Sequence, residues 1–476
     1  MTYTPETTKN GIAPETGIDD SVIATFEEQL GGRLIRPQDA DYDKVRALWN
    51  GMIDNRPALI AQVAGVADVM AAVKFAREHD LRVSVRGGGH NVAGNAVADG
   101  GFVIDMRPMR GIHVDPFEQT ATAQGGVVWG DLDREAQAFG LATPGGVFAE
   151  TGIAGLTLGG GLGWLRRKHG LSVDNLVSVD MVTADGEFVR ASETENSDLF
   201  WGIRGGGGNF GIVTSFKYKL HKVGPEGYFL SVFHPGDIAR AGLQFYREWA
   251  ATAPDEISSF AILATVPATE DFPAAWHGKT SLVFLAYYDG PTDEGERLLQ
   301  PLREFADPVA DFSDVMPYTA VQNFFEEDYP DGMRYYWKSR YMAALPDDAI
   351  DLLITLMNEN PSPHTTLDLW QLGGAMARIG ADETAFGDRS AAFLLGIESN
   401  WEEAADDDAN IAWNRKVFEL VKPYATDAEY LNFPGFYENS EEQVKNAFGH
   451  NFARLVELKR KYDPTNFFRL NQNIKP

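Results

Sequence analysis

The sequence contains no cysteine. Disulfides, thiolate metal sites, cysteine-ligated iron–sulfur clusters and cysteine nucleophiles are therefore excluded together. Basic residues are also scarce, because 41 Lys and Arg face 69 Asp and Glu, giving a formal charge of -28. Such a charge repels phosphate backbones and anionic membranes, so we expect no nucleic-acid partner. The acidic excess is equally typical of adaptation to high salt, and that hypothesis stays open.

Long hydrophobic runs are missing as well. No stretch approaches the apolar length of a membrane span, so no membrane partner is expected. The first residues, MTYTPETTKNGIAPETG, lack the basic region and apolar run of a secretory signal, which predicts a cytoplasmic protein. The 476 residues, 44% of them hydrophobic, are too many for one ordinary core and enough for two domains.

The sequence pattern changes near residues 223–227, which predicts a domain boundary there. Residues 1–18 are polar and resemble a loose leader, and a helix is expected after Asp19 and Asp20. From about Pro57 strands alternate with helical patterns, which predicts an α+β domain whose glycines fall at strand ends. After His221 longer β-rich runs and acidic helical stretches follow. The last segment, from Tyr462 on, is polar and does not read as a helix.

Three glycine clusters lie before residue 212: Gly87–Gly89, Gly159–Gly161 with Gly163, and Gly205–Gly208 with Gly211. Successive glycines let the backbone approach a ligand and turn its N–H groups toward an anion. Together the clusters suggest a long, phosphate-bearing ligand, although each alone is equally compatible with a tight turn. A Rossmann domain fits poorly, since RGGGHNVAG opens no helix and LGGGLGWLRRKHG lacks the following acidic residue. No P-loop motif occurs.

Four segments in order carry a family resemblance: RGGGHNVAGNAVADGGFVIDM, TGIAGLTLGGGLGWLRRKHGLSVDNL, DLFWGIRGGGGNFGIVTSF and KYDPTNFFRLNQNI. They resemble the berberine bridge enzyme-like flavoproteins, of the vanillyl-alcohol-oxidase (PCMH) type, in the microbial branch near aclacinomycin oxidoreductase, gluco-oligosaccharide oxidase and the enterocin flavin oxygenase. The resemblance implies an α+β fold of two domains. Residues 1–222 would bind FAD, with a core at about 54–222. Residues 223–429 would form an antiparallel substrate-binding sheet covered by helices, and residues 430–476 would return to the FAD domain.

The same resemblance implies how FAD is held. The loop Arg86, Gly87, Gly88, Gly89 and His90, with Asn91 and Gly94 after it, would wrap the pyrophosphate, and His90 would bond the flavin's 8α carbon. Many relatives add a cysteine link near the position of Phe148, which this chain cannot form, so a single histidyl link is expected. The alternative for His90 is a hydrogen-bonded loop histidine.

Further cofactor contacts are implied in three places. They are Thr151, Gly152, Gly155, Gly159, Gly160, Gly161 and Gly163 beside the flavin ring and pyrophosphate; Asn209, Gly211, Ile212 and Val213 at the adenosine half; and Asn471 and Asn473 on the C-terminal return. Thr151 would influence oxygen access. The alternatives are simple packing, a glycine-rich hairpin and a frayed tail.

A base must take a proton while hydride moves to the flavin. Tyr430, in AEYLNFPGF, resembles the family's substrate-facing tyrosine, but a phenol with a pKa of about 10 needs a carboxylate partner or the field of the oxidised flavin. Asp368 matches an acidic position near that tyrosine in oligosaccharide-oxidising relatives. Trp370 and Gln371 are expected to line the same cleft, although strand alternation points Gln371 to the opposite face. Glu398 is a reserve candidate for the base.

These residues predict an FAD-dependent oxidase that acts on a hydroxylated small molecule, a sugar or a secondary metabolite, and reduces molecular oxygen to hydrogen peroxide. No metal site is expected. Three alternatives stay open: a flavin-dependent oxygenase or a dehydrogenase with another acceptor, an amine oxidase, and a ligand carrier without redox chemistry.

Overall fold

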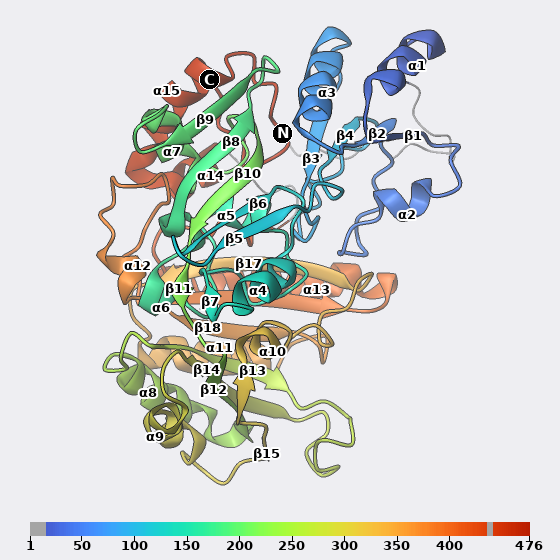
Figure 1. The fold of residues 1–476 in the computed structure, drawn as a ribbon. Helices are drawn as coiled ribbons and strands as arrows, with labels where there is room; N and C mark the ends of the chain where they lie inside the picture. The colour runs from blue at the N-terminus through green and yellow to red at the C-terminus, as the bar shows by residue number, and fades with distance from the viewer. Residues whose placement is uncertain (1–15, 436–440) are drawn as a thin grey trace.

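The computed structural model describes residues 16–435 and 441–476. Most of the polar leader predicted over residues 1–18 therefore lies outside the described residues. The helix expected after Asp19 is α1 (Asp20–Gln29). Figure 1 shows the smaller sheets in one half of the molecule and the large sheet in the other. The smaller ones have four, five and two strands, and the last pairs β7 (Leu141–Ala142) with β11 (His221–Lys222).

The first half begins with a four-stranded sheet of mixed direction. Its spatial order is β1 (Arg33–Ile35), β2 (Leu59–Gln62), β4 (Phe102–Asp105) and β3 (Val83–Arg86). Helix α3 (Val66–Glu78) buries a stripe at helical spacing, with Val69, Ala72, Val73 and Ala76 inside. Strand β3 ends at Arg86, so the first glycine cluster leaves the sheet directly at a strand end.

A five-stranded antiparallel sheet completes this half. Its order is β5 (Ile112–Asp115), β6 (Thr120–Gln124), β10 (Ile212–Lys219), β8 (Leu176–Val182) and β9 (Phe188–Ser192). Helices α4 (Trp129–Gln137), α5 (Ile153–Leu158), α6 (Arg166–His169) and α7 (Ser197–Ile203) belong to the same part of the chain. The third glycine cluster lies between α7 and β10.

The large sheet is antiparallel and has eight strands. Its path is β15 (Ala310–Asp311), β12 (Glu226–Pro235), β14 (Thr280–Tyr288), β13 (Ile257–Thr265), β18 (Thr366–Gln371), β19 (Phe393–Trp401) and β17 (Arg334–Met342), with β16 (Asp314–Pro317) also on β12. One face packs under α8 (Ala239–Ala250), α9 (Thr292–Arg303), α11 (Asp347–Met357) and α13 (Asp407–Leu420). The other face meets the first half of the molecule.

The C-terminal segment returns to the first half, near α7 (Figure 1). Helices α14 (Glu441–Phe448) and α15 (Phe452–Tyr462) bury Phe448 and Leu455 against its core. The buried ammonium of Lys459 donates to the Asn209 and Phe468 carbonyls and to Asp463, at 2.7–2.9 Å. The predicted α+β class, with a helix-covered antiparallel second sheet, is confirmed. No helix among the described residues has the length and apolarity needed to cross a membrane.

Candidate active site

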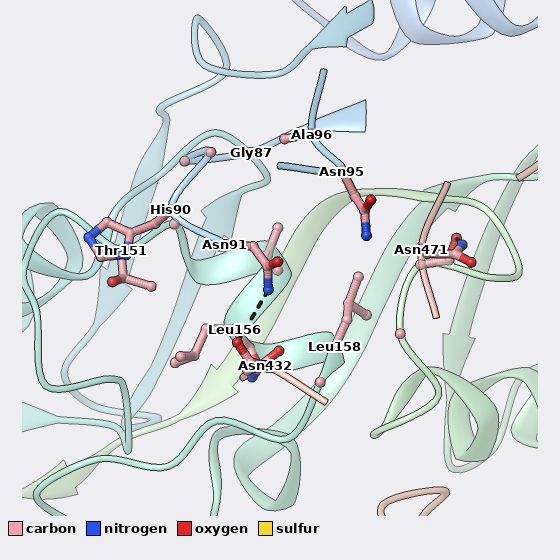
Figure 2. Close-up of a pocket in the computed structure, with 18 of the residues that line it drawn as sticks. Gly87, His90, Asn91, Asn95, Ala96, Thr151, Leu156, Leu158, Asn432 and Asn471 are labelled. Atoms are coloured by element: carbon pink, nitrogen blue, oxygen red, sulfur yellow. Dashed lines mark hydrogen bonds between the residues drawn. The ribbon is translucent and has the colours of Figure 1, made fainter. Parts of the chain in front are cut away.

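A long cavity runs between the two halves of the molecule. It encloses about 1660 Å³ of empty space, part of it open to solvent. Figure 2 shows residues around it, with His90 and Thr151 toward one end and Asn471 toward the other. The predicted residues on its wall are Gly87, Gly88, Gly89, His90, Asn91, Phe148, Thr151, Gly152, Gly155, Gly159, Gly211, Ile212, Val213, Trp370, Tyr430 and Asn471.

Backbone without side chains forms much of one wall. The first glycine loop touches the residue that precedes α5, because a Cβ at Gly88 would lie 2.5 Å from the Gly152 nitrogen. At Gly155 and Gly208, which also line the cavity, a Cβ would meet no atom within 4 Å. These two glycines therefore leave room in the cavity that a side chain would fill. A glycine cradle of this kind suits a dinucleotide whose pyrophosphate comes close to the backbone.

Arg86 differs from the other predicted residues of the first glycine loop, because its side chain does not line the cavity. Its guanidinium donates to the carbonyls of Val45 at 2.6 Å and Ala47 at 2.7 Å. Burial lowers the pKa of Arg86 to about 10, with the nearby Arg107 adding to the shift. The side chain therefore anchors the segment before β2 instead of reaching a phosphate. Gly94 is also absent from the wall, since it faces Ile53.

Three glycines of the second cluster serve packing instead of the cavity wall. Gly160 faces the ring of Phe386, Gly161 faces Ser172, and Gly163 faces the Gly145 carbonyl. Gly160 and Gly161 have φ values of 117° and 87°, which a residue with a side chain rarely adopts. Their predicted contact with the cofactor stays a prediction, and packing alone already requires glycine at these three positions.

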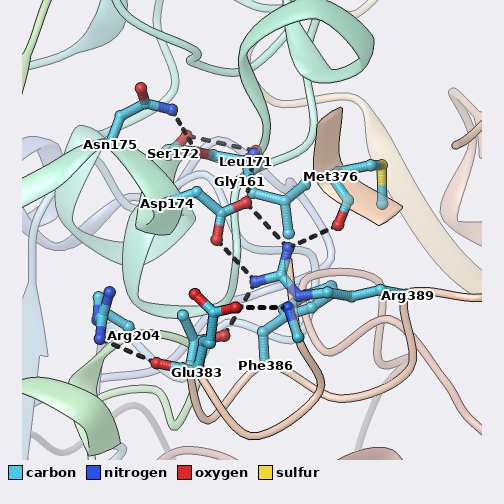
Figure 3. Close-up of polar contacts among 12 residues, drawn as sticks. Gly161, Leu171, Ser172, Asp174, Asn175, Arg204, Met376, Glu383, Phe386 and Arg389 are labelled. Carbon is cyan, nitrogen blue, oxygen red and sulfur yellow. Dashed lines mark hydrogen bonds and ion pairs between the residues drawn. The ribbon is translucent and has the colours of Figure 1, made fainter. Parts of the chain in front are cut away.

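A buried ion pair fixes the loop that carries Phe386. The guanidinium of Arg389 donates to both oxygens of Asp174, at 2.9 and 2.7 Å, and also to Thr384 and the Met376 carbonyl. Figure 3 shows Arg389 between Asp174 and Met376. The loop between β18 and β19 is thereby held against the second glycine cluster.

The asparagines of the C-terminal return divide into two groups. Asn471 lines the cavity, and its amide donates to the Gly208 carbonyl at 3.0 Å. Asn209 is buried beside the return, where its amide group bonds the Gly206 and Gln472 carbonyls and the Ile474 N–H. Neither Asn209 nor Asn473 lines the cavity, so their predicted contact with the cofactor stays a prediction.

His90 lines the cavity with its imidazole stacked on Trp49, the ring centroids 4.0 Å apart. Phe148 lies on another side, at 5.6 Å between centroids. Burial lowers the pKa of His90 to about 4. The imidazole is therefore neutral at neutral pH and keeps a free nitrogen lone pair.

Tyr430 lies on the cavity wall with a hydroxyl that accepts N–H donors. The Leu162 N–H donates to it at 3.2 Å and the Asn432 amide at 2.9 Å. Burial raises the pKa of Tyr430, and these donors oppose that rise because they stabilise a phenolate. The phenol oxygen is thus oriented by two donors, and burial keeps its own proton in place at neutral pH.

Asp368 does not pair with Tyr430, which corrects the predicted partnership. No hydrogen bond joins them among the described residues, and the ring of Phe433 contacts both Tyr430 and Trp370. Asp368 instead meets Glu398, because the register sets Asp368 opposite Gly396 and Thr366 opposite Glu398. A Cβ at Gly396 would lie 3.0 Å from Glu398 Oε1 and 3.5 Å from Asp368 Cβ.

The two carboxyl groups are buried behind the cavity wall. Burial raises the pKa of Asp368 to about 7. Burial and the neighbouring Asp368 raise the pKa of Glu398 well above its usual value, while the Tyr329 hydroxyl donates to Glu398 at 3.3 Å. At neutral pH the pair therefore holds at least one proton.

Trp370 lines the cavity, whereas Gln371 faces the helix-covered side of the sheet. The Gln371 amide donates to the Ala250 carbonyl at 2.7 Å and accepts from Ser259 at 2.7 Å. Its prediction as a cleft residue is therefore wrong, because strand alternation decides the face. No group of three or more His, Asp and Glu side chains among residues 16–435 and 441–476 is arranged to hold a metal.

The sequence reasoning missed several wall residues. Asn432 and Phe433 follow Tyr430 in the same segment, and Trp337 lies on β17. Proximity to Tyr430 could have indicated the first two, since they sit two and three positions later. Trp337 carries no local signal, because its face depends on the pairing of β17 with β19.

Comparison with known proteins identifies the family. A model described as "FAD binding domain" matches residues 57–192, and one described as "Berberine and berberine like" matches residues 429–475. An FAD-linked oxidoreductase of Dictyostelium discoideum is 30% identical over 460 residues, covering 96% of this chain and 97% of that protein. The (R)-6-hydroxynicotine oxidase of Paenarthrobacter nicotinovorans is 30% identical over 464 residues, covering 94% and 97%.

The fold agrees with these matches. The crystal structure of 6-hydroxy-D-nicotine oxidase from Arthrobacter nicotinovorans superposes with a TM-score of 0.84 at 29% identity, covering 94% of this chain and 98% of that one. Residues of both matched segments, 57–192 and 429–475, line the cavity. The chain belongs to the berberine bridge enzyme-like family of FAD-linked oxidoreductases.

Proposed function

We propose that this protein is an oxidase that takes hydride from a hydroxylated small molecule, a sugar or a secondary metabolite, and that its FAD is attached through His90. The observation that carries the proposal is the cavity itself, which joins a glycine cradle to an aromatic wall that includes Tyr430. When bound, FAD supplies a hydride acceptor at N5 and passes two electrons to oxygen, giving hydrogen peroxide. The chain supplies binding, orientation and a base.

Attachment through His90 is supported by the chemistry of the side chain. The imidazole lies on the cavity wall, and burial lowers its pKa to about 4, so it is an uncharged nucleophile at neutral pH. The sequence has no cysteine, and Phe148 lines the wall near His90. A single link is therefore proposed.

Tyr430 is the proposed base. Its oxygen accepts the Leu162 and Asn432 N–H groups, which offset part of the rise in pKa that burial causes, and the phenolate that they stabilise would take the substrate hydroxyl proton. It stands on the cavity wall, whereas Asp368 and Glu398 lie behind it. The carboxyl pair would then adjust the charge near the substrate without touching it.

Two measurements test these assignments. Acid-precipitated wild type should carry flavin fluorescence in the pellet, whereas His90→Ala should release it to the supernatant. Anaerobic reduction by a substrate from a panel of sugars, phenolic alcohols and amines, followed by oxygen, should yield about one peroxide per substrate. Little peroxide would refute the oxidase and favour an oxygenase or a dehydrogenase with another acceptor.

Tyr430→Phe tests the base separately. The variant should keep flavin in the acid pellet, yet its flavin should be reduced by substrate about 100-fold more slowly, the usual contribution of a general base. An unchanged rate of reduction would remove Tyr430 from the mechanism and make Asp368 and Glu398 the next candidates.

A further inference from the structure

Trp49 is sandwiched between two rings from opposite halves of the molecule. Its centroid lies 4.0 Å from that of His90, with 14° between the planes, and 3.7 Å from that of Tyr335, with 7° between the planes. Two rings parallel to the indole at such distances occupy opposite faces of it. Trp49 thus links the first glycine loop to strand β17 of the large sheet.

Hydrogen bonds hold Trp49 firmly in this stack. Its indole N–H donates to the Tyr329 carbonyl at 2.9 Å, and its own carbonyl accepts the Gly332 N–H at 2.8 Å. The next residue, Asn50, donates through its side chain to the carbonyls of Val92 and Tyr335, at 2.8 and 2.9 Å. The indole is buried and does not line the cavity. Its position is therefore fixed by the protein and independent of any ligand.

We infer that Trp49 is a positioning residue for covalent attachment of the flavin: it holds the His90 imidazole edge-on to the cavity and stabilises the positive charge that the ring gains as its nitrogen forms the bond. The inference rests on the proposed attachment through His90. A ring stacked on one face can rotate only in its own plane, so its nitrogens stay directed along the stack plane. The face of an indole is also the most favourable aromatic partner for a cation.

The attachment balances as follows: an N–H bond of His90 and a C–H bond of the flavin methyl group are replaced by one N–C bond. Two protons and two electrons are released, and dioxygen takes them to become hydrogen peroxide. The imidazole is cationic between formation of the N–C bond and loss of its proton. An aromatic face at 4.0 Å is placed to lower the energy of that state.

The test follows covalent flavin and not turnover. Wild type, Trp49→Phe and Trp49→Leu are incubated with FAD after purification, acid-precipitated at intervals, and the flavin fluorescence of the pellets is compared. We expect Trp49→Leu to attach flavin roughly tenfold more slowly or worse, and Trp49→Phe, which keeps an aromatic face, to stay within about threefold of wild type. Met333→Ala opens space in the same hydrophobic cluster but leaves the indole in place, and it should match wild type.

The outcomes separate this inference from the proposed attachment. Wild type without flavin in the pellet would refute attachment itself. Wild type with attached flavin, together with Trp49→Leu labelled equally fast, would overturn the role of Trp49 alone. If Trp49→Leu binds no FAD, Trp49→Met decides in its place, because it keeps bulk without an aromatic face. If Trp49→Met attaches flavin as fast as Trp49→Phe does, the inference is overturned. Slower attachment in Trp49→Met supports it.

Discussion

Replacing Asp133 by asparagine should stabilise the protein, and the gain should grow as the pH rises. Asp133 lies on α4 of the FAD half and is 1% exposed. One carboxylate oxygen accepts the Gln322 amide at 2.8 Å across the domain interface, and the other has no hydrogen-bond partner among the described residues. Burial raises the pKa of Asp133 to about 7. An ionised Asp133 is therefore a buried charge without a cation.

The size and sign of the effect follow from linkage. The folded state holds the Asp133 proton more tightly than the unfolded chain, whose pKa is near 3.8. The stability this supplies is complete below about pH 4 and is lost as the pH rises through about 7. At about 1.36 kcal/mol per pKa unit, the shift corresponds to about 4 kcal/mol at most. Asparagine cannot ionise, and its amide can also reach Gln322 Oε1, which has no partner among the described residues.

The assay is the melting temperature of holoprotein between pH 5 and 8.5. Asp133→Asn should gain about 2–4 kcal/mol over wild type at pH 8, and the gain should shrink toward pH 5. Glu135→Gln, an exposed carboxylate on the same helix, should show no such pH-dependent gain. A gain independent of pH, or a loss at pH 8, would refute the reasoning.

The remaining predictions concern buried charges. Asp368→Asn should raise the melting temperature above pH 7, where the raised pKa of Asp368 makes wild type least stable, and should lower the pH at which Glu398 ionises, seen as loss of its infrared carboxyl band. Arg389→Met leaves Asp174 buried without its cation and should cost about 3–5 kcal/mol, measured by melting. Lys459→Met should cost a similar amount and make the C-terminal helices more sensitive to trypsin.

The glycine wall of the cavity was largely predictable because backbone geometry constrains the residue type. A Cβ at Gly88 would collide with the Gly152 nitrogen, so only glycine fits where the two loops touch. A sequence that folds this way must therefore have glycine at such positions. The same clusters also contain glycines needed for packing, such as Gly160 against Phe386, and spacing alone does not distinguish the two uses.

Side-chain direction was less predictable where it depends on distant segments. Arg86 turns toward the carbonyls of Val45 and Ala47, about 40 positions earlier, and nothing in the loop sequence encodes that choice. Asp368 meets Glu398 only because β18 and β19 pair in one register. If that register shifted by one residue, the side chain of Glu398 would lie on the opposite face of the sheet from that of Asp368.

The residue types on the two walls of the cavity are therefore constrained in different ways. This difference determines which positions can be substituted. The glycine wall tolerates few substitutions, since Gly88 and Gly152 exclude each other's side chains. The opposite wall consists of side chains such as Trp337, Trp370 and Phe433, whose backbones are already held by strand pairing or a tight turn. Changing these side chains alters the shape of the cavity while the hydrogen bonds of their own backbones are kept. Substrate choice can therefore change on this scaffold while the glycine wall is kept.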